Sequence, residues 1–217
     1  MAYRAVAFDM DGLILDTEVI YNQVGLRLMA SHGVTYPAEL RRAIMGRRPL
    51  DCFTEMIRWH ALRNVTPVRL EAESNAIFMQ LVKEQGAALM PGFAALIDVL
   101  ESCGVRRCIC TSASRPLMEA SLAPEVARRF EFVVTAEDIV HGKPDPEIYR
   151  LAAARLGITP SEMVVLEDSQ NGCLAGHAAG AMTVAVVAPH CEGQMYTDAD
   201  LITDRLDSTE LLSLFAK

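Results

Sequence analysis

The sequence predicts an α/β protein, with a Rossmann-like, doubly wound and mostly parallel sheet and a small helical domain inserted after the first strand. Short apolar stretches alternate with helix-length stretches from residue 92 onward. Residues 18–85 lack strand-like runs and carry apolar residues at helical spacing. An apolar strand at residues 3–8 precedes them. Because strand–helix–strand connections are right-handed crossovers, this alternation indicates a parallel sheet.

The inserted stretch is divided by residues that interrupt helices. Gly33, Pro37, the segment 46–49 and Pro67 separate about four apolar-periodic segments. Helices without strands, placed between the first strand and the later ones, indicate a separate unit. We therefore expect residues 1–16 and 88–217 to form the α/β core and residues 17–87 to form a four-helix domain.

The second part of the chain reads as alternating helices and strands. The expected strands are residues 107–111, 132–135, 163–166 and 183–187. The expected helices are residues 93–102, 146–156, 170–179 and 208–215, with a further helix after Ser114. Ser114 suits a helix N-cap because Pro116 follows in the first turn, and Gly104, Gly157 and Gly180 are natural stops.

The composition restricts the possible partners. The chain has 217 residues, of which 51% are hydrophobic and 22% charged, with a formal net charge of −8. Such a chain can bury a core, and its acidic balance argues against nucleic acids and anionic membranes as general partners. A small anionic substrate needs only a local positive pocket and is not excluded.

The six cysteines have no metal-binding spacing, and no Cys-x-x-Cys pair occurs. Their apolar surroundings suggest buried free thiols in a reducing compartment. The N-terminus shows no signal peptide, and no apolar run is long enough to span a membrane. We therefore expect a cytoplasmic, soluble monomer.

Two acids stand directly after the first expected strand. Asp9 and Asp11 have i, i+2 spacing, and Gly12 follows at once. One interpretation is a nucleophile and metal site at the carboxyl end of the strand. The other is a solvated turn, since Asp and Gly are ordinary turn residues.

Other expected strands also end in polar residues, which favours the first interpretation. Ser112 and the amide of Ala113 follow the second strand and could hold phosphate, although Ser and Thr there are also common helix caps. Glu167 and Asp168 follow the fourth strand. Ligands bind beyond the carboxyl ends of parallel strands, and so many carboxylates suit Mg²⁺.

Lys143 lies between Gly142 and a Pro-Asp-Pro segment at an expected helix start. A lysine is usually a solvated surface charge. A cation gains nothing from the dipole at a helix N-terminus. Its position is explained if Lys143 neutralises an anion and an aspartate near the metal.

These motifs, in this order, resemble the haloacid dehalogenase superfamily of phosphatases. The match runs through Asp-x-Asp-Gly at 9–12, the hydroxyls at 111–112, Gly-Lys-Pro at 142–144 and Glu-Asp-Ser at 167–169. The helical insert is similar to that superfamily's C1 cap, which places the chain in subfamily I. Segments 9–18, 45–48 and 88–92 look most like the branch that contains pseudouridine-5′-phosphatases and β-phosphoglucomutases.

The resemblance implies an Mg²⁺-dependent phosphomonoester hydrolase for a small sugar phosphate or nucleotide-like ester. Asp9 would form an aspartyl-phosphate, and Asp11 would act as general acid and base. Asp9, the carbonyl of Asp11 and Asp168 would hold Mg²⁺, with Glu167 as a direct or water-bridged ligand. Ser112, the Ala113 amide and Lys143 would hold the phosphoryl oxygens.

Two other functions compete with hydrolysis. A mutase of the β-phosphoglucomutase type would use a histidine and an arginine of the cap, but Ile20 or Tyr21 and Pro49 stand at those positions. A silent phosphate-binding module is the other alternative, although every chemical residue is present. Arg47, in a glycine-flanked turn of the cap, is a candidate substrate contact, or else a solvated charge.

Overall fold

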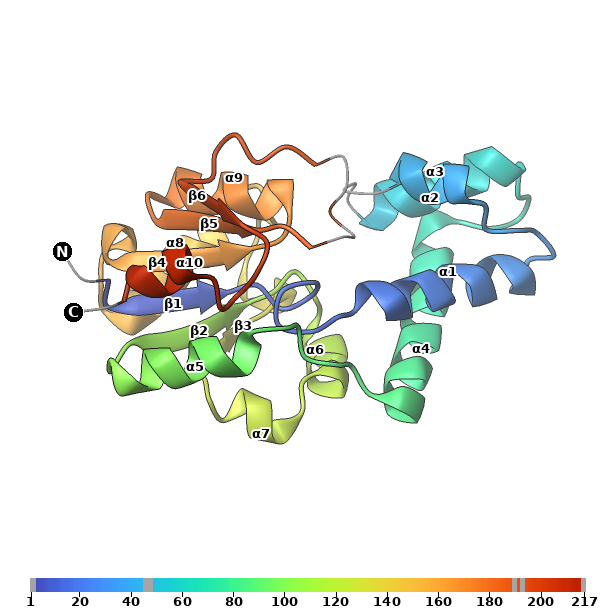
Figure 1. The fold of residues 1–217 in the computed structure, drawn as a ribbon. Helices are drawn as coiled ribbons and strands as arrows, with labels where there is room; N and C mark the ends of the chain where they lie inside the picture. The colour runs from blue at the N-terminus through green and yellow to red at the C-terminus, as the bar shows by residue number, and fades with distance from the viewer. Residues whose placement is uncertain (1–2, 45–48, 189–190, 192–193, 216–217) are drawn as a thin grey trace. The chain divides into compact units, whose positions relative to one another are not determined.

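The computed structural model describes residues 3–44, 49–188, 191 and 194–215. The chain divides into two compact units, Met1–Asp16 with Ala88–Lys217, and Thr17–Ala87. Figure 1 shows the ribbon of both units, with the elements labelled. None of the helices in the described ranges is long and apolar enough to cross a membrane.

The first unit is built on one parallel sheet. Among the described residues, six strands pair in the order β3-β2-β1-β4-β5-β6. Their bounds are β1 Ala5–Phe8, β2 Arg106–Cys110, β3 Val133–Val134, β4 Met163–Glu167, β5 Met182–Val186 and β6 Leu201–Thr203. Its helical elements are α5 Phe93–Ser102, α6 Arg115–Ser121, α7 Pro124–Ala127, η1 Ala136–Asp138, α8 Glu147–Leu156, η2 Pro160–Glu162, α9 Gln170–Ala179 and α10 Thr209–Ser213. The predicted doubly wound α/β fold is confirmed.

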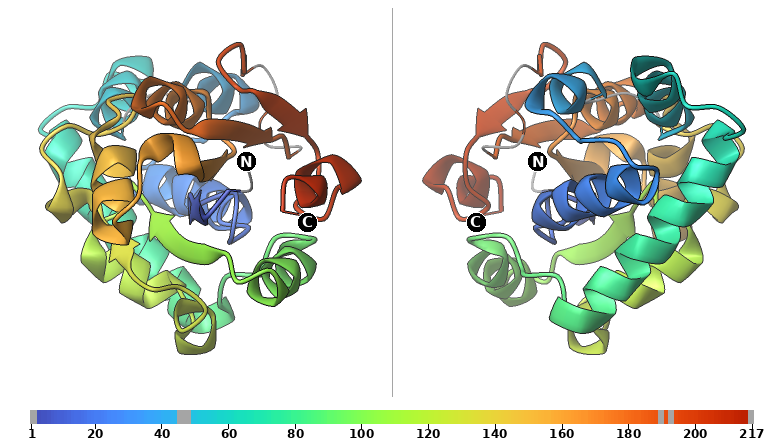
Figure 2. Two further views of the ribbon diagram at one scale, coloured as in Figure 1. Left: turned by 90° about the vertical axis from the view of Figure 1, so that its left-hand side faces the viewer. Right: turned by 90° about the vertical axis from the view of Figure 1, so that its right-hand side faces the viewer.

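Helices cover both faces of this sheet (Figures 1 and 2). Because successive strand residues point to opposite faces, alternate residues of β1 contact different helices. Ala5 and Ala7 join a core cluster with the buried side of α8 and with α9. Phe8 instead packs edge-on against Phe93 of α5 and against Phe130, at centroid distances of 6.3 and 5.3 Å.

The second unit contains four helices in its described part. They are α1 Glu18–Ser31, α2 Ala38–Ile44, α3 Pro49–His60 and α4 Pro67–Gln85. Its core includes Leu28, Leu40 and Leu70. The hydroxyl of Thr66 caps α4 by accepting from the Arg69 amide, directly before Pro67. The expected helices are thus present, and their apolar stripes form the core of the unit.

The chain departs from the predicted elements in small ways. β6 and α7 were not expected from the sequence, and β3 has two residues instead of four. Ser114 holds the N-cap position of α6, as predicted, but its hydroxyl makes no capping hydrogen bond. The backbone amide of Arg115 instead donates to the carboxylate of Glu137.

Candidate active site

Asp9 continues the ladder at the end of β1. Its amide donates to the carbonyl of Leu166 in β4 at 3.0 Å, and its side chain is buried. Gly12 then turns the chain with φ of 79°, a conformation that residues with a Cβ adopt only under strain. The Gly12 amide donates to the Leu15 carbonyl at 2.8 Å. This tight loop keeps Asp11 next to the strand end.

The register of the sheet explains why acids from distant segments meet. Phe8 pairs with Leu166 in β4 and with Ile109 in β2. The next row therefore contains Asp9, Glu167 and Cys110. Side chains in one row of a parallel sheet share a face, and this is the face that α8 covers.

Lys143 joins the three residues of that row. Its Nζ donates to Asp9 Oδ1 at 2.5 Å, to Glu167 Oε1 at 2.6 Å and to the Cys110 carbonyl at 2.9 Å. The lysine side chain is only 5% exposed, so it is not a solvated surface charge. Because an ammonium has three N–H donors, these contacts use all of them.

The two acids at the end of β4, its last residue Glu167 and the following Asp168, have different surroundings. Glu167 is completely buried, and it also accepts hydrogen bonds from Tyr149 and Ser169. The backbone carbonyl of Asp168 accepts from the Tyr196 hydroxyl at 2.6 Å and from the Cys191 thiol at 3.3 Å. Carboxylate oxygens of Asp9, Glu167 and Asp168 lie within 4.8 Å of one another, a spacing that could hold a metal ion.

The segment directly after β2 contacts Asp11. Thr111 Oγ1 donates to Asp11 Oδ2 at 3.4 Å and accepts from the Ala113 amide at 3.0 Å. Ser112 is exposed at the strand end. The Ala113 amide was expected to hold phosphate, so a phosphoryl oxygen would have to share or displace the Thr111 bond.

Burial and neighbouring charges together shift the pKa values of Asp9 and Lys143. Burial raises the pKa of Asp9, the Lys143 ammonium lowers it, and the nearby carboxylates of Glu167, Asp168 and Asp11 raise it again. Burial alone would lower the pKa of Lys143, but Asp9 and Glu167 outweigh it and raise that pKa, so the lysine stays charged. Within the described part of the chain, Asp9 thus shares one ammonium with Glu167 and lies close to further carboxylates.

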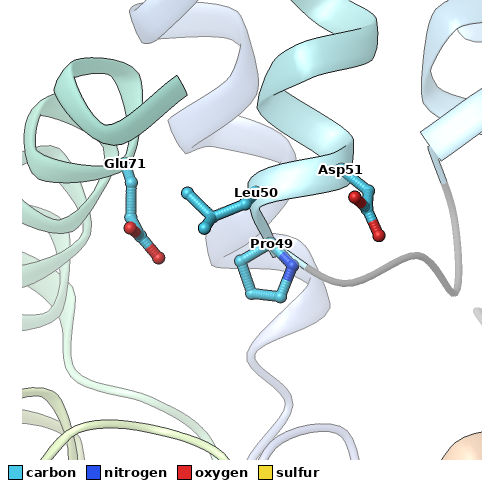
Figure 3. Close-up of a pocket in the computed structure, with 4 residues that line it drawn as sticks. All are labelled: Pro49, Leu50, Asp51 and Glu71. Atoms are coloured by element: carbon cyan, nitrogen blue, oxygen red, sulfur yellow. The ribbon is translucent and has the colours of Figure 1, made fainter. Parts of the chain in front are cut away.

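The predicted substrate contact Arg47 lies outside the described residues. A separate hollow of about 370 Å³ occurs on the helical unit, lined by Pro49, Leu50 and Asp51 at the start of α3 and by Glu71 of α4. Figure 3 shows Leu50 directed toward Glu71 and Asp51 on the other side of the helix.

Tyr149 and Tyr196 were not identified from the sequence. Both hydroxyls contact the Glu167–Asp168 pair, from α8 and from the segment after Cys191. One signal was available for Tyr149: it lies on the apolar stripe of α8 with Ile148 and Ala152, and a buried tyrosine hydroxyl needs a partner. The sequence does not say which partner.

A family model, haloacid dehalogenase-like hydrolase, matches residues 3–180. The chain belongs to this family. A phosphorylated carbohydrates phosphatase of Thermotoga maritima is 33% identical, over 82% of this chain and 82% of its own length. A probable pseudouridine-5′-phosphatase of Drosophila melanogaster is 33% identical, over 84% and 80%. The structure of CbbY from Rhodobacter sphaeroides in complex with phosphate has a TM-score of 0.81 at 24% identity, covering 98% of this chain and 99% of that one, which shows the shared fold.

These comparisons decide two of the predictions. The predicted superfamily is confirmed, and so is the prediction that the chain is an enzyme. The fold class agrees with the family as well.

Proposed function

We propose that this enzyme is an Mg²⁺-dependent phosphomonoester hydrolase that acts on a small, sugar-like phosphorylated metabolite through an aspartyl-phosphate on Asp9. The observation that supports it best is the buried cluster of Asp9, Lys143 and Glu167 beside Asp168. The names of the relatives, a phosphorylated carbohydrates phosphatase and a probable pseudouridine-5′-phosphatase, support the substrate class.

Asp9 and Asp168 fit a magnesium site, together with the carbonyl of Asp11 and with Glu167 as a direct or water-bridged ligand. The fit rests on hard oxygen donors and on their mutual distances. Bound Mg²⁺ would supply charge neutralisation to the phosphoryl group.

The chemistry of the chain's own residues follows in two steps. A carboxylate oxygen of Asp9 attacks phosphorus, the bond to the leaving oxygen breaks, and Asp11 donates a proton to that oxygen. Asp11, now a carboxylate, takes a proton from water as the water attacks phosphorus. The bond to Asp9 breaks, phosphate leaves and both acids return to their starting states.

In this proposal Lys143 acts on the transferring group through its charge, because its three donors are used within the protein, and the end of β2 contacts the group directly. The Lys143 ammonium already donates a hydrogen bond to Asp9, so it can stabilise negative charge that develops beside that residue. Ser112 and the Ala113 amide would contact the other phosphoryl oxygens. Thr111 keeps Asp11 near the same place through its 3.4 Å contact.

The helical unit is proposed to serve as a cap that selects the substrate and excludes water during transfer. Arg47 would contact the part of the substrate away from the phosphate. Replacement of Arg47 by alanine should then raise KM for the preferred sugar phosphate and leave hydrolysis of a small aryl phosphate unchanged. A cytoplasmic location and a monomeric state stay predictions.

The test is phosphate release from an aryl phosphate with and without Mg²⁺, in the wild type, Asp9→Asn and Asp98→Asn. Asp98 is a matched control because its side chain on α5 is 72% exposed and pairs only with Arg129 among the described contacts. We expect Mg²⁺-dependent release by the wild type and Asp98→Asn, and a loss of at least ~10³-fold in Asp9→Asn. Equal activity of all three proteins would refute the mechanism.

A further inference from the structure

Tyr149 is a buried residue that the mechanism above does not use. It lies in α8, has no exposed surface and belongs to the apolar cluster beneath the sheet. Its hydroxyl donates to Glu167 Oε1 at 2.6 Å. Burial raises the pKa of Tyr149, and the charge of Glu167 adds to this effect, so the hydroxyl keeps its proton and remains a donor.

Glu167 accepts protein hydrogen bonds on both of its carboxylate oxygens. Oε1 accepts from Tyr149 and from Lys143 Nζ, each at 2.6 Å. Oε2 accepts from the Ser169 hydroxyl at 2.9 Å and from the Ser169 amide at 3.3 Å. A carboxylate offers about four lone-pair directions, so these donors use its capacity.

The backbone of α9 closes the remaining side of Glu167. A Cβ placed on Gly172 would lie 1.8 to 2.1 Å from the carboxylate atoms of Glu167. The carboxylate therefore occupies space that only glycine leaves open. Glu167 is fixed from α8, from the lysine and from the start of α9.

The fixed carboxylate in turn determines where Lys143 lies. The three N–H donors of the ammonium go to Asp9, Glu167 and the Cys110 carbonyl, and Nζ also lies 5.2 Å from the centroid of the Tyr149 ring. A mobile Glu167 would release one of these three anchors. The lysine would then lose its fixed place on Asp9.

We propose that Tyr149 is a positioning residue: its hydroxyl fixes Glu167, which anchors Lys143 against Asp9 and acts through that lysine rather than as a direct metal ligand. This inference rests on the proposed phosphoryl transfer and deepens it. It assigns the two acids at the end of β4 different roles: of the two metal contacts considered for Glu167 it excludes the direct one, which leaves Asp168 as the direct metal ligand of the pair.

The lysine content of the chain allows a test that needs no turnover. The chain contains three lysines, Lys83, Lys143 and Lys217. We expect the ¹⁵N-labelled wild type to show a Lys143 ammonium signal whose protons exchange slowly, because this group is buried and triply bonded. Lys143→Arg identifies that signal by removing it, and exposed Lys83 is the internal reference.

Tyr149→Phe removes the hydroxyl and keeps the ring that faces the lysine. We expect the Lys143 signal to shift and its protons to exchange at least tenfold faster, with the Lys83 signal unchanged. In the kinetic assay, kcat should fall about tenfold, as for a lost hydrogen bond to a charged group. KM and the half-saturating Mg²⁺ concentration should stay within about twofold of the wild type, because the proposed metal ligands are intact.

Two comparisons separate positioning from support of the fold. In a Glu167→Gln background, Tyr149→Phe should lower kcat less than twofold further, since coupled residues are not additive. Tyr196→Phe removes the hydroxyl of a half-buried tyrosine, which donates to the Asp168 carbonyl. It should change the half-saturating Mg²⁺ concentration and leave the Lys143 signal in place.

The outcomes are distinct. An unchanged Lys143 signal and unchanged kcat in Tyr149→Phe would show that Tyr149 only packs. A Glu167→Gln protein that needs over tenfold more Mg²⁺ but keeps the Lys143 signal would show that Glu167 is a metal ligand, contrary to the proposal.

If Tyr149→Phe does not fold, Ser169→Ala tests the opposite oxygen of Glu167 and should also disturb the Lys143 signal. If the wild type hydrolyses no phosphate ester, the proposed function fails, and the ammonium signal still decides the positioning role.

Discussion

The ends of β1 and β4 each carry two acids, but the two pairs differ in the hydrogen-bond donors that surround their carboxylates. After β1, the chain turns at Gly12, and Asp9 and Asp11 contact Lys143 and Thr111 respectively. At the end of β4, the acids are adjacent, and Glu167 accepts hydrogen bonds from four donors of three residues. In the contacts of the described residues, both oxygens of Glu167 are occupied by protein donors, which leaves this carboxylate little capacity to bind anything else. A pair of acids at a strand end therefore need not be a pair of metal ligands.

A third strand end provides a reference for an acid whose charge the protein itself compensates. Asp138, in η1 after β3, accepts from Arg115, Arg155 and the amide of Thr135. The Arg155 hydrogen bond and then the Thr135 amide lower the pKa of Asp138 to about 2. Asp9, by contrast, has a raised pKa because burial and other acids outweigh its single lysine.

The largest effect should follow removal of the cation shared by both strand ends. Lys143→Met leaves Asp9 and Glu167 buried without their ammonium partner. We expect kcat to fall about 10²–10³-fold. The free energy of unfolding without Mg²⁺ should fall by about 3–5 kcal/mol, the range for a broken buried ion pair. Lys83→Met, at an exposed position of α4, is the control and should match the wild type in both measurements.

The second effect concerns metal removal and distinguishes the roles of Glu167 and Asp168 at the end of β4. At about 100 times its Kd, Mg²⁺ should stabilise the wild type by about 2.7 kcal/mol relative to the protein in EDTA. For a chain of this size that is about 5–10 °C in Tm. Asp168→Asn should lose most of this increase, whereas Glu167→Gln should keep most of it. The opposite ranking in a thermal melt would reverse the roles assigned to the two residues.

A smaller effect should follow from a change that adds one methyl group next to Glu167. Gly172→Ala places Cβ within the carboxylate of Glu167 and should lower kcat about tenfold while costing about 1–3 kcal/mol by overpacking. Gly176→Ala, one turn later on α9, would meet Thr183 Oγ1 at 2.7 Å instead. It should lower Tm without a change in kcat. Similar kcat losses in both variants would mean that general packing of α9, not Glu167, is responsible.

The smallest effect is a dependence of stability on pH at Asp138. Its folded pKa of about 2 lies below the ordinary value of 3.8, so the contribution is complete above pH 4 and lost as pH falls toward 2. Asp138→Asn should therefore be less stable than the wild type at pH 5, and the difference should shrink at pH 3. Urea unfolding at both values measures it, and a difference that grows at pH 3 would contradict the assigned pKa.

Much of the fold could be predicted from the sequence because most helices and strands have clear local sequence patterns. The helices α5 and α9 have the predicted bounds, since glycines end them and apolar residues repeat along one side. β6 was missed because its three residues at the sheet edge are too few for a recognisable apolar run, and its middle residue is exposed. α7 is a single turn, too short for any periodicity.

The site was only partly readable from the sequence. Acids and hydroxyls at strand ends indicate where chemistry occurs, but the partners follow from register. The pairing of Phe8 with Leu166 and Ile109 places Asp9, Glu167 and Cys110 in one row, and no local pattern specifies that pairing. For the same reason Tyr149 could be recognised as buried but not as a donor to Glu167.

The central claim is that Asp9 becomes phosphorylated, and trapping the intermediate tests it most directly. The enzyme is mixed with substrate and Mg²⁺, quenched with acid and treated with borohydride, which reduces an acyl phosphate to an alcohol. Mass spectrometry of the peptides should find homoserine in place of Asp9, and none in substrate-treated Asp9→Asn. Homoserine at another acid, or rapid phosphate release with no reduced carboxyl at any position, would contradict the account.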